Sequence, residues 1–286
     1  MGMEYTLLKG SNFHQIYQEI VQNLITQGEI VWKTKEALFL NFVLSDPLNN
    51  KIEYDKNWKW CYAEFFDRMV GLNPGTAYHF RSKWQRNLER EGGTFDYSYG
   101  DSFKSQLPKV VRALKKEYDR EAIISVWDKG FLDRGSYARR PCTLTIQFYN
   151  RKGYLHCFVN MRSNDVINLL PYDVFHHTSL QTFIASITGL RLGNYYHTCA
   201  QYYWPKKREL RGFGEKMLEK LQATTPPQNT HFPWVEPRLS LVNASKTIRS
   251  YISHHNFEDI GIPDPYIQGL VNYITTRVTA NATSET

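Results

Sequence analysis

The chain has 286 residues and a formal charge of +7, with 42% hydrophobic and 15% aromatic residues. This composition excludes disorder over most of the chain, and the length allows one large domain or two small ones. No apolar run approaches the roughly 20 residues of a membrane helix, and the amino terminus lacks the pattern of a signal peptide. We therefore expect a cytoplasmic protein without a membrane partner.

The spacing of the cysteines argues against a metal site and against a disulfide scaffold. The chain has four, none of them in a CxxC pair: Cys61, Cys142, Cys157 and Cys199. We expect reduced thiols and no bound metal. The basic charge favours an anionic partner, either nucleic acid or a phosphorylated small molecule. Because the basic residues form no long run, we expect the small molecule rather than nucleic acid.

Apolar residues at helical spacing predict three helices in the first part of the chain. They cover residues 13–27, where Gly28 ends the pattern, 58–70 and 107–118. Pro108 lies near the start of the third, where proline is tolerated. This part of the chain is therefore expected to be mainly helical.

The middle of the chain changes to an alternating pattern. Residues 143–148 and 155–161 alternate polar and apolar side chains, and a turn signature, Asn-Arg-Lys-Gly, lies between them at 150–153. These segments predict two antiparallel strands, and residues 122–127 are a further strand candidate.

A fourth helix is predicted over residues 174–188, where Gly189 ends it. The proline-rich residues 224–239 predict an extended connector, followed by a short strand at 239–242 and a frayed carboxyl-terminal tail. Helices and strands are mixed without regular βαβ alternation, which favours an α+β fold. No GxGxxG or Walker pattern is present, so nucleotide binding of those kinds is not predicted.

Two polar clusters carry candidate chemistry. Cys142 follows Arg139 and Arg140, and two cations beside a cysteine lower its pKa and favour the nucleophilic thiolate. The alternative is a structural cysteine beside two solvated arginines. Arg162 and Ser163 can bind a phosphate, arginine through two parallel hydrogen bonds and serine as a donor. The alternative for this pair is a turn whose polar groups cap the next element.

Together with their neighbours, these residues resemble the thymidylate synthase family. The matching segments are PC at 141–142, QFY at 147–149, RSNDV at 162–166, PYD at 171–173, ITGLRLG at 187–193 and HT at 197–198. The similarity is concentrated in residues 118–200, and residues 211–286 match weakly. The resemblance implies one α+β domain over residues 1–286, with a mixed sheet flanked by helices and a homodimer interface on one sheet face.

Two departures from the family pattern concern the base of the substrate. Thr143 stands where the synthases have histidine, and Asp173 stands where they have asparagine. An asparagine amide matches N3–H and O4 of uracil, whereas a carboxyl that shares a proton matches N3 and the amino group of cytosine. A helix N-cap is the plainer reading of Asp173. The chain is similar to the deoxycytidylate (dCMP) hydroxymethylases of phages, which share both residues.

The resemblance implies that a cytidylate, dCMP or CMP, is converted to its 5-hydroxymethyl derivative with methylenetetrahydrofolate. Cys142 would add to C6 of the pyrimidine, and Glu64 would relay protons through water, unless it is an ordinary solvated helix residue. One alternative is reductive C5 methylation of dCMP or dUMP, as in thymidylate synthase. Another is an inactive homologue that binds a nucleotide or nucleic acid. A bacterium or a phage is the expected source.

The same resemblance assigns the remaining site residues. The catalytic group is Cys142, Glu64 and Asp173, and the substrate-binding group is Arg162, Ser163, Asn164, Asp165, Arg120, Lys33, Tyr203 and Thr143. The folate-binding group is Trp84, Tyr99, Asp165 and Glu64, although Trp84 and Tyr99 fit a core role equally well.

Three assignments depart from the family pattern. Arg120 is expected to reach the phosphate of the partner subunit, but Glu121 replaces the second arginine of that pair. Lys33 replaces another phosphate-binding arginine. Tyr203 and Pro205 replace the histidine and tyrosine that hold the sugar hydroxyl, so the sequence leaves ribose and deoxyribose open.

Overall fold

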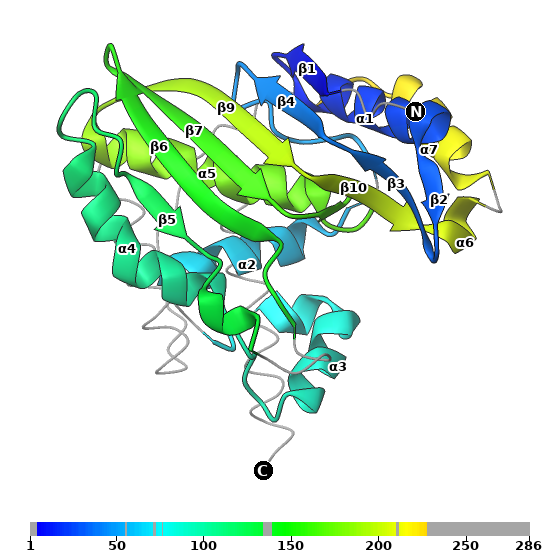
Figure 1. Cartoon of the computed structure of the whole chain (residues 1–286), viewed down its shortest axis with the longest axis horizontal. Helices are drawn as coiled ribbons and strands as arrows, with labels where there is room; N and C mark the ends of the chain where they lie inside the picture. Colours follow the sequence, from blue (N-terminus) through cyan, green and yellow to red (C-terminus); the bar gives the residue numbers. More distant parts are fainter. Residues whose placement is uncertain are drawn as a thin grey trace. The chain divides into compact units, whose positions relative to one another are not determined.

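The computed structural model describes residues 5–54, 56–70, 73–75, 77–133, 139–209 and 212–227. The chain forms two compact units (Figure 1). Among the described residues, the first unit holds those before Asn57 and after Pro108, and the second unit holds Asn57–Pro108. Most of the predicted connector at 224–239, the predicted strand at 239–242 and the tail lie outside the described residues.

The first unit contains a mixed sheet of six strands. They are β1 (Thr6–Gly10), β4 (Leu40–Leu44), β5 (Ile123–Ser125), β6 (Thr143–Arg151), β7 (Tyr154–Met161) and β9 (Arg191–Cys199). Their order is β1-β4-β9-β7-β6-β5. β1 pairs with β4, and β9 with β7, in parallel, whereas the other neighbours are antiparallel. The predicted hairpin is therefore confirmed as β6 and β7, and the strand candidate at 122–127 as β5.

A smaller sheet is formed largely by segments that lie next to strands of the large sheet along the chain. Its strands are β2 (Glu29–Val31), β3 (Thr34–Leu38), β10 (Gln201–Pro205) and β8 (Asn164–Asp165), in that order. Only Phe39 separates β3 from β4, and only Ala200 separates β9 from β10. The Phe39 N–H donates to the Ala200 carbonyl oxygen, and the Ala200 N–H donates to that of Met161, both at 3.1 Å. Three stretches of chain thus pass from one sheet toward the other at adjacent positions.

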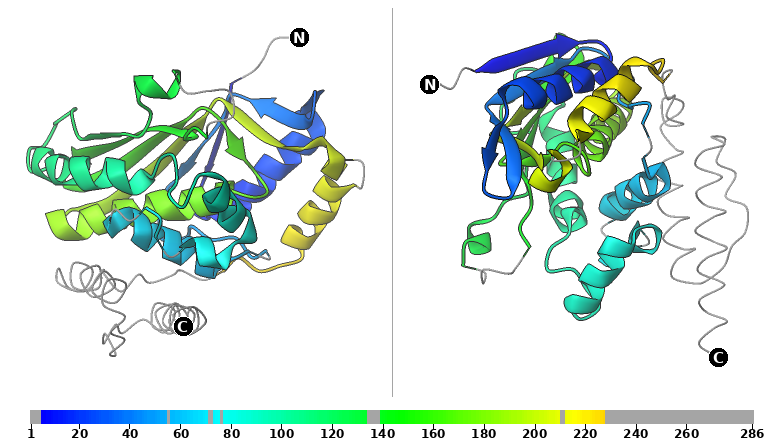
Figure 2. Two further views of the ribbon diagram at one scale, coloured as in Figure 1. Left: turned by 90° about the horizontal axis from the view of Figure 1, so that it is seen from below. Right: turned by 90° about the vertical axis from the view of Figure 1, so that its right-hand side faces the viewer.

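The helix α5 (Leu170–Thr188) covers one face of the large sheet (Figure 2). It connects the parallel strands β7 and β9, and such a connection has to cross over the sheet. Alternate residues of the two strands are buried on this face: Leu155, Cys157, Val159, Met161, Tyr195, His197 and Cys199. The residues between them are half-exposed, among them His156, Phe158, Asn160, Tyr196 and Thr198. The opposite face of the sheet is therefore partly open along these strands.

The helix α1 (Phe13–Gln27) has the bounds that its apolar spacing predicts. The Asn12 side chain accepts from the His14 N–H at 2.8 Å, which caps the first turn. The buried His14 ring also bonds the Leu221 carbonyl oxygen at 2.9 Å, and so joins α1 to α7 (Phe213–Gln222). The short helix α6 (Lys206–Glu209) lies between β10 and α7, so regular structure continues past Arg211.

The described part of the second unit, Asn57–Pro108, is mainly helical. It holds α2 (Trp58–Val70), the 3-10 helix η1 (Ala77–Phe80), α3 (Ser82–Arg90) and most of α4 (Tyr99–Ala113). A further 3-10 helix, η2 (Lys129–Phe131), belongs to the first unit. The predicted bounds of α2 are confirmed, and the Asp67 carboxylate joins it to η1 by accepting from the Ala77 N–H at 2.8 Å.

Two predicted helix starts are wrong. The helix expected at 107–118 is α4, which begins at Tyr99 and contains Pro108 in its interior. Its start is marked by Ser98, whose hydroxyl accepts from the Gly100 N–H at 3.1 Å. The helix expected from residue 174 begins at Leu170, so Asp173 lies in its first turn and is not the N-cap. In the described part of the chain, no helix is both long and apolar enough to cross a membrane.

Candidate functional site

The candidate site is centred on Cys142, which precedes β6 and is half-buried. The β6–β7 hairpin places it opposite the end of β7, where the Arg162 N–H donates to the Cys142 carbonyl oxygen at 2.9 Å. The two turn residues, Lys152 and Gly153, have φ angles of 54° and 75°, as a type I′ turn requires. This turn sets the register that brings Cys142 beside the polar residues after β7.

The Arg162 guanidinium binds the backbone that carries the cysteine. Its Nε donates to the Pro141 carbonyl oxygen at 3.0 Å, and its Nη2 to that of Arg140 at 3.4 Å. Its Nη1 donates to Ser163 Oγ at 3.2 Å. The Arg162 side chain is nevertheless exposed, so an anion that approaches from solvent can reach its charge.

The groups around the Cys142 thiol have opposing effects on its pKa. Burial has the largest effect and raises the pKa, and the charges of Asp173 and Asp165 raise it further. The Arg162 charge lowers it, and so does Ser163, whose hydroxyl donates to Sγ at 3.7 Å. The net direction is upward, so the resting thiol is protonated at neutral pH.

The predicted activation of Cys142 by Arg139 and Arg140 is wrong. The cation that lowers its pKa is Arg162, which the hairpin supplies from the next strand. Arg140 Nε instead donates to the Phe131 carbonyl oxygen at 2.7 Å. Neighbours along an extended chain point in different directions, so adjacency in sequence does not place a cation beside the sulfur.

Asp165 holds the turn that follows β8. Its Oδ1 accepts from the N–H groups of Ile167 and Asn168, at 3.1 and 2.9 Å, and its Oδ2 accepts from the Asn168 side chain at 2.8 Å. Asn164 and Thr143 are buried as well, at 1% and 0% exposure. All three therefore have a structural role in the protein, and any contact with a ligand would be additional to it.

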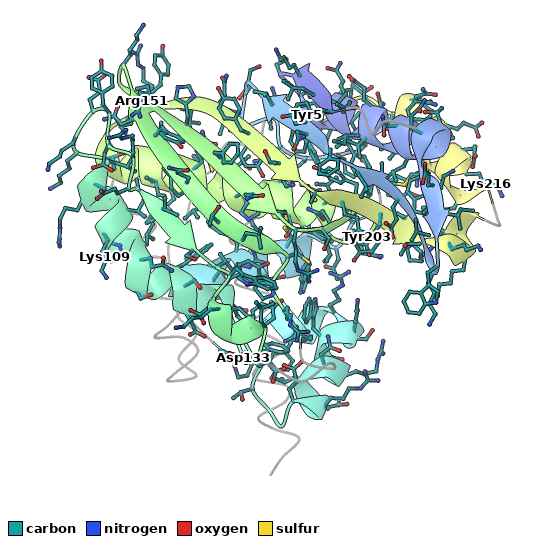
Figure 3. All side chains as sticks on the ribbon, viewed as in Figure 1. Tyr5, Lys109, Asp133, Arg151, Tyr203 and Lys216 are labelled. Carbon is teal, nitrogen blue, oxygen red and sulfur yellow. The ribbon has the colours of Figure 1, made fainter. Side chains whose placement is uncertain are left out.

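Asp173 and Tyr203 lie close to the thiol. Asp173 is 8% exposed, and its charge adds to burial in raising the pKa of Cys142, Cys199 and Tyr203. Its carboxyl is thus within electrostatic range of all three. Tyr203, labelled in Figure 3, lies on β10 of the smaller sheet. It pairs in register with Asp165 of β8. Cys199 is absent from the predicted site residues, although the alternation along β9 would have placed it on the buried face.

Two predicted phosphate contacts lie elsewhere in the first unit. Lys33 is at the exposed tip of the β2–β3 hairpin, where its Nζ lies 4.3 Å from the centre of the Trp32 ring. Arg120 is exposed before β5, and its carbonyl oxygen accepts from Gln147 at 3.1 Å. Gln147 lies roughly 13 Å along β6 from the start of that strand. A contact of Arg120 with substrate at Cys142 would therefore have to come from a second copy of the chain.

The second unit contains the other three predicted site residues. Glu64 Oε1 accepts from Arg68 Nη2 at 2.5 Å, and its Oε2 is buried without a hydrogen-bond partner among the described residues. The Arg68 guanidinium carbon lies 4.2 Å from the centre of the Tyr99 ring. One cation therefore joins Glu64 to Tyr99, and Glu64 keeps one acceptor oxygen for a ligand.

Trp84 belongs to an aromatic stack within the same unit. Its ring is parallel to that of Trp60, with centroids 6.3 Å apart and an interplanar angle of 9°. The Arg81 guanidinium lies 4.5 Å from the Trp60 ring, and Phe95 meets Trp84 edge-on at 5.9 Å. Trp84 is half-buried, so part of its surface remains accessible. These contacts give Trp84 a packing role, which is one of the two roles that the sequence left open; the other is folate binding.

Comparison with known proteins reveals one family. The family model described as thymidylate synthase matches residues 8–264. Thymidylate synthase of Mycoplasma pneumoniae is 24% identical over 265 residues, which cover 87% of this chain and 84% of that protein. Thymidylate synthase 1 of Bacillus subtilis is 30% identical over 190 residues, which cover 60% of this chain and 57% of that protein.

The solved structure of thermostable thymidylate synthase A from Bacillus subtilis has the same fold. It matches with a TM-score of 0.61 and 20% identity, covering 77% of this chain and 87% of that one. The predicted α+β fold of the thymidylate synthase type is therefore confirmed.

The environment of Cys142 predicts how its reactivity depends on pH. Because burial dominates, the midpoint for alkylation by iodoacetamide should lie above about 8.5, the ordinary thiol pKa. Arg162→Gln removes the charge that stabilises the thiolate, so it should raise the midpoint further. The measurement is the alkylation rate of the Cys142 peptide against pH, followed by mass spectrometry.

Arg151→Gln is the matched control, because Arg151 lies at the far end of β6, and it should leave the midpoint unchanged (Figure 3). Arg162→Lys keeps the charge and should give the smaller shift. A wild-type midpoint below that of a free thiol, or equal midpoints in the two glutamine variants, would contradict the electrostatic description.

Proposed function

The chain belongs to the thymidylate synthase family, and we propose that it transfers a one-carbon unit from methylenetetrahydrofolate to C5 of a pyrimidine nucleoside monophosphate. The observation that carries this proposal is the Cys142 thiol, which accepts from Ser163 and lies near the Arg162 charge. The family uses methylenetetrahydrofolate, which agrees with the co-substrate expected from the sequence.

Cys142 supplies the nucleophile. Its thiolate bonds to C6 of the pyrimidine, and the electron pair of the C5–C6 double bond then makes C5 a carbon nucleophile. C5 bonds to the one-carbon unit, and loss of the C5 proton then breaks the bond between that unit and the folate nitrogen. Addition of a hydride from the folate (methylation) or of water (hydroxymethylation) to the exocyclic carbon would expel the thiolate and restore the C5–C6 double bond. Arg162 supports the thiolate form, because its charge lowers the pKa of Cys142 against the effect of burial.

The polar residues around Cys142 orient the nucleotide. The exposed Arg162 guanidinium binds the phosphate as a bidentate cation, and the Ser163 hydroxyl donates to the phosphate when its proton turns away from Cys142 Sγ. Tyr203, which lies within electrostatic range of the thiol, contacts the sugar. Asn164, Asp165 and Thr143 support these groups through the turn and strand that they hold.

The second unit offers groups that fit a folate. Glu64 Oε2 is a buried acceptor without a partner among the described residues, which suits an N–H donor of a pterin ring or an ordered water. The aromatic rings of Trp84 and Tyr99 offer surfaces for stacking. When bound, methylenetetrahydrofolate supplies the one-carbon unit, and Glu64 accepts and returns protons at its free oxygen.

Asp173 indicates which base the site takes. Its position, in the first turn of α5 and within electrostatic range of Cys142, is where the family resemblance places base recognition. A carboxyl group that holds a proton donates to N3 of cytosine and accepts from its amino group, whereas an asparagine amide suits uracil. We therefore propose a cytidylate, CMP or dCMP, as the substrate.

The fate of the one-carbon unit distinguishes two candidate reactions. The relatives are named thymidylate synthase, which supports reductive methylation, the alternative from the sequence, ahead of hydroxymethylation. Hydroxymethylation of a cytidylate is the second candidate, and Asp173 and Thr143 favour it because the resembled hydroxymethylases share both residues. The polar and charged groups around the Cys142 thiol argue against the alternative of an inactive homologue.

We also propose a homodimer through the partly open face of the large sheet. Half-exposed aromatic side chains on that face, among them Phe158 and Tyr196, would be covered by a second copy. Arg120 supports the same arrangement, because its distance along the sheet from the start of β6 requires a second copy to bring it to a substrate phosphate.

The first test is incubation with methylenetetrahydrofolate and each of CMP, dCMP, UMP and dUMP. A gain of CH2 with formation of dihydrofolate would establish methylation, and a gain of CH2O without dihydrofolate would establish hydroxymethylation. Mass spectrometry and dihydrofolate absorbance identify the product.

Cys142→Ala should abolish turnover while largely retaining nucleotide binding, since it removes only the nucleophile. Product formation by this variant would refute covalent catalysis by Cys142.

Asp173→Asn tests the base. The substitution replaces a carboxyl by the amide that suits uracil, so the preference for cytidylate over the uridylate with the same sugar should fall by about a hundredfold. The preference is measured as the ratio of the two dissociation constants by calorimetry. Asp128→Asn is the control, because Asp128 caps a surface 3-10 helix and should not alter the ratio. An unchanged ratio in Asp173→Asn would refute base reading by the carboxyl.

Mixed dimers test the role of Arg120. Arg120→Ala and Cys142→Ala homodimers should both be nearly inactive. Equal mixing, with exchange of subunits, should restore about a quarter of the wild-type activity, because each hybrid has one site with both residues intact. The measurement is turnover before and after exchange, with mixing of Cys142→Ala and wild type as the control. No recovery would contradict a site shared between subunits.

A further inference from the structure

Three buried side chains form a hydrogen-bonded cluster between α5 and β9. The histidine–tyrosine cluster consists of His177 on α5 and Tyr195 and His197 on β9, all exposed by 1% or less. Tyr195 Oη lies 2.7 Å from His197 Nδ1 and 3.4 Å from His177 Nδ1. Tyr195 therefore joins the strand to the helix that carries Asp173.

The strand side of the cluster is closely packed and uncharged. The His197 ring stacks on Phe42, with centroids 4.8 Å apart and an interplanar angle of 7°. Burial lowers the pKa of His197 to about 3 and raises that of Tyr195, and the charge of Asp173 adds to the latter effect. Both groups remain neutral at physiological pH, so the cluster acts through hydrogen-bond geometry rather than through charge.

Tyr195 can bind both imidazoles at once, because a phenol donates one hydrogen bond while it accepts another. The 2.7 Å contact with His197 lies within β9 and is the shorter of the two. The 3.4 Å contact with His177 is the one that crosses from β9 to α5.

The helix end of this connection lies one turn from Asp173. Residues four apart on a helix share a face, with Cβ atoms about 6 Å apart, and helix side chains lean toward the amino terminus. The His177 ring therefore leans toward the turn that carries Asp173. The ionisable groups within electrostatic range of Tyr195 include Asp173, Cys157 and Cys199, so the carboxyl and the cluster share one buried region.

We propose that Tyr195 is a positioning residue for base selectivity, which holds the first turns of α5 against β9 through His177 and so fixes the Asp173 carboxyl where it reads the base. This inference rests on the proposed function. It gives the buried face of β9 a functional role that is separate from the roles of Cys142, Arg162 and the folate contacts.

The test measures dissociation constants of CMP, dCMP, UMP and dUMP for the full chain by calorimetry. Tyr195→Phe should lower the preference for cytidylate over uridylate by about three- to tenfold, the effect of one lost hydrogen bond. In the Asp173→Asn background it should have no further effect on that ratio, because the group that it positions is gone. A purely structural loss would weaken both nucleotides equally.

Tyr5→Phe is the control, since Tyr5 is an exposed residue that precedes β1, outside the cluster, and the ratio of this variant should equal that of the wild type. His177→Leu removes the side chain on α5 that Tyr195 contacts, and it should lower the ratio in the same way. It replaces Tyr195→Phe in the test if that variant does not fold. An unchanged ratio in these variants, or an equal effect in the Asp173→Asn background, would overturn the inference. If Asp173→Asn itself leaves the ratio unchanged, the proposed base reading fails instead.

Discussion

The register of the β6–β7 hairpin is the constraint on which the candidate site depends. Cys142 precedes one strand and Arg162 follows the other, so they meet only because the two-residue turn at Lys152 and Gly153 fixes how the strands pair. A shift of the strand register by one residue would move each side chain to the opposite face of the sheet. The chain also passes between the two sheets at Phe39 and at Ala200, beside the end of β7. This places Tyr203 of β10 near the thiol.

Much of this framework follows from periodicity. The long segments α1, α2, β6 and β7 have clear patterns, because each buries one face against a continuous core. The smaller sheet was not predicted, since strands of two to five residues are too short to show a period. The start of α4 was missed because Pro108 favoured a later first turn, while the cap at Ser98 is a single hydroxyl.

The proximity of the candidate site residues could be predicted better than their electrostatics, while their roles stay a prediction. The cluster of Cys142, Arg162, Ser163 and Asp173 comes together as their family spacing suggests. The effect of burial on the thiol could not be read from sequence, because it depends on how much chain packs around the sulfur. Sequence also could not show that Tyr195 and His197 share a hydrogen bond two residues apart on one strand face, since that depends on the rotamers that packing selects.

The same electrostatics would link the proposed base recognition to the nucleophile. The Asp173 charge raises the pKa of Cys142, so an ionised carboxylate disfavours the thiolate that the proposed reaction needs. In the proposed complex, a cytosine that shares a proton with this carboxyl would reduce that charge. Binding of the correct base would therefore lower the pKa of the thiol in the complex. The site would thus activate Cys142 in response to the base, rather than keep a permanent thiolate exposed to other electrophiles.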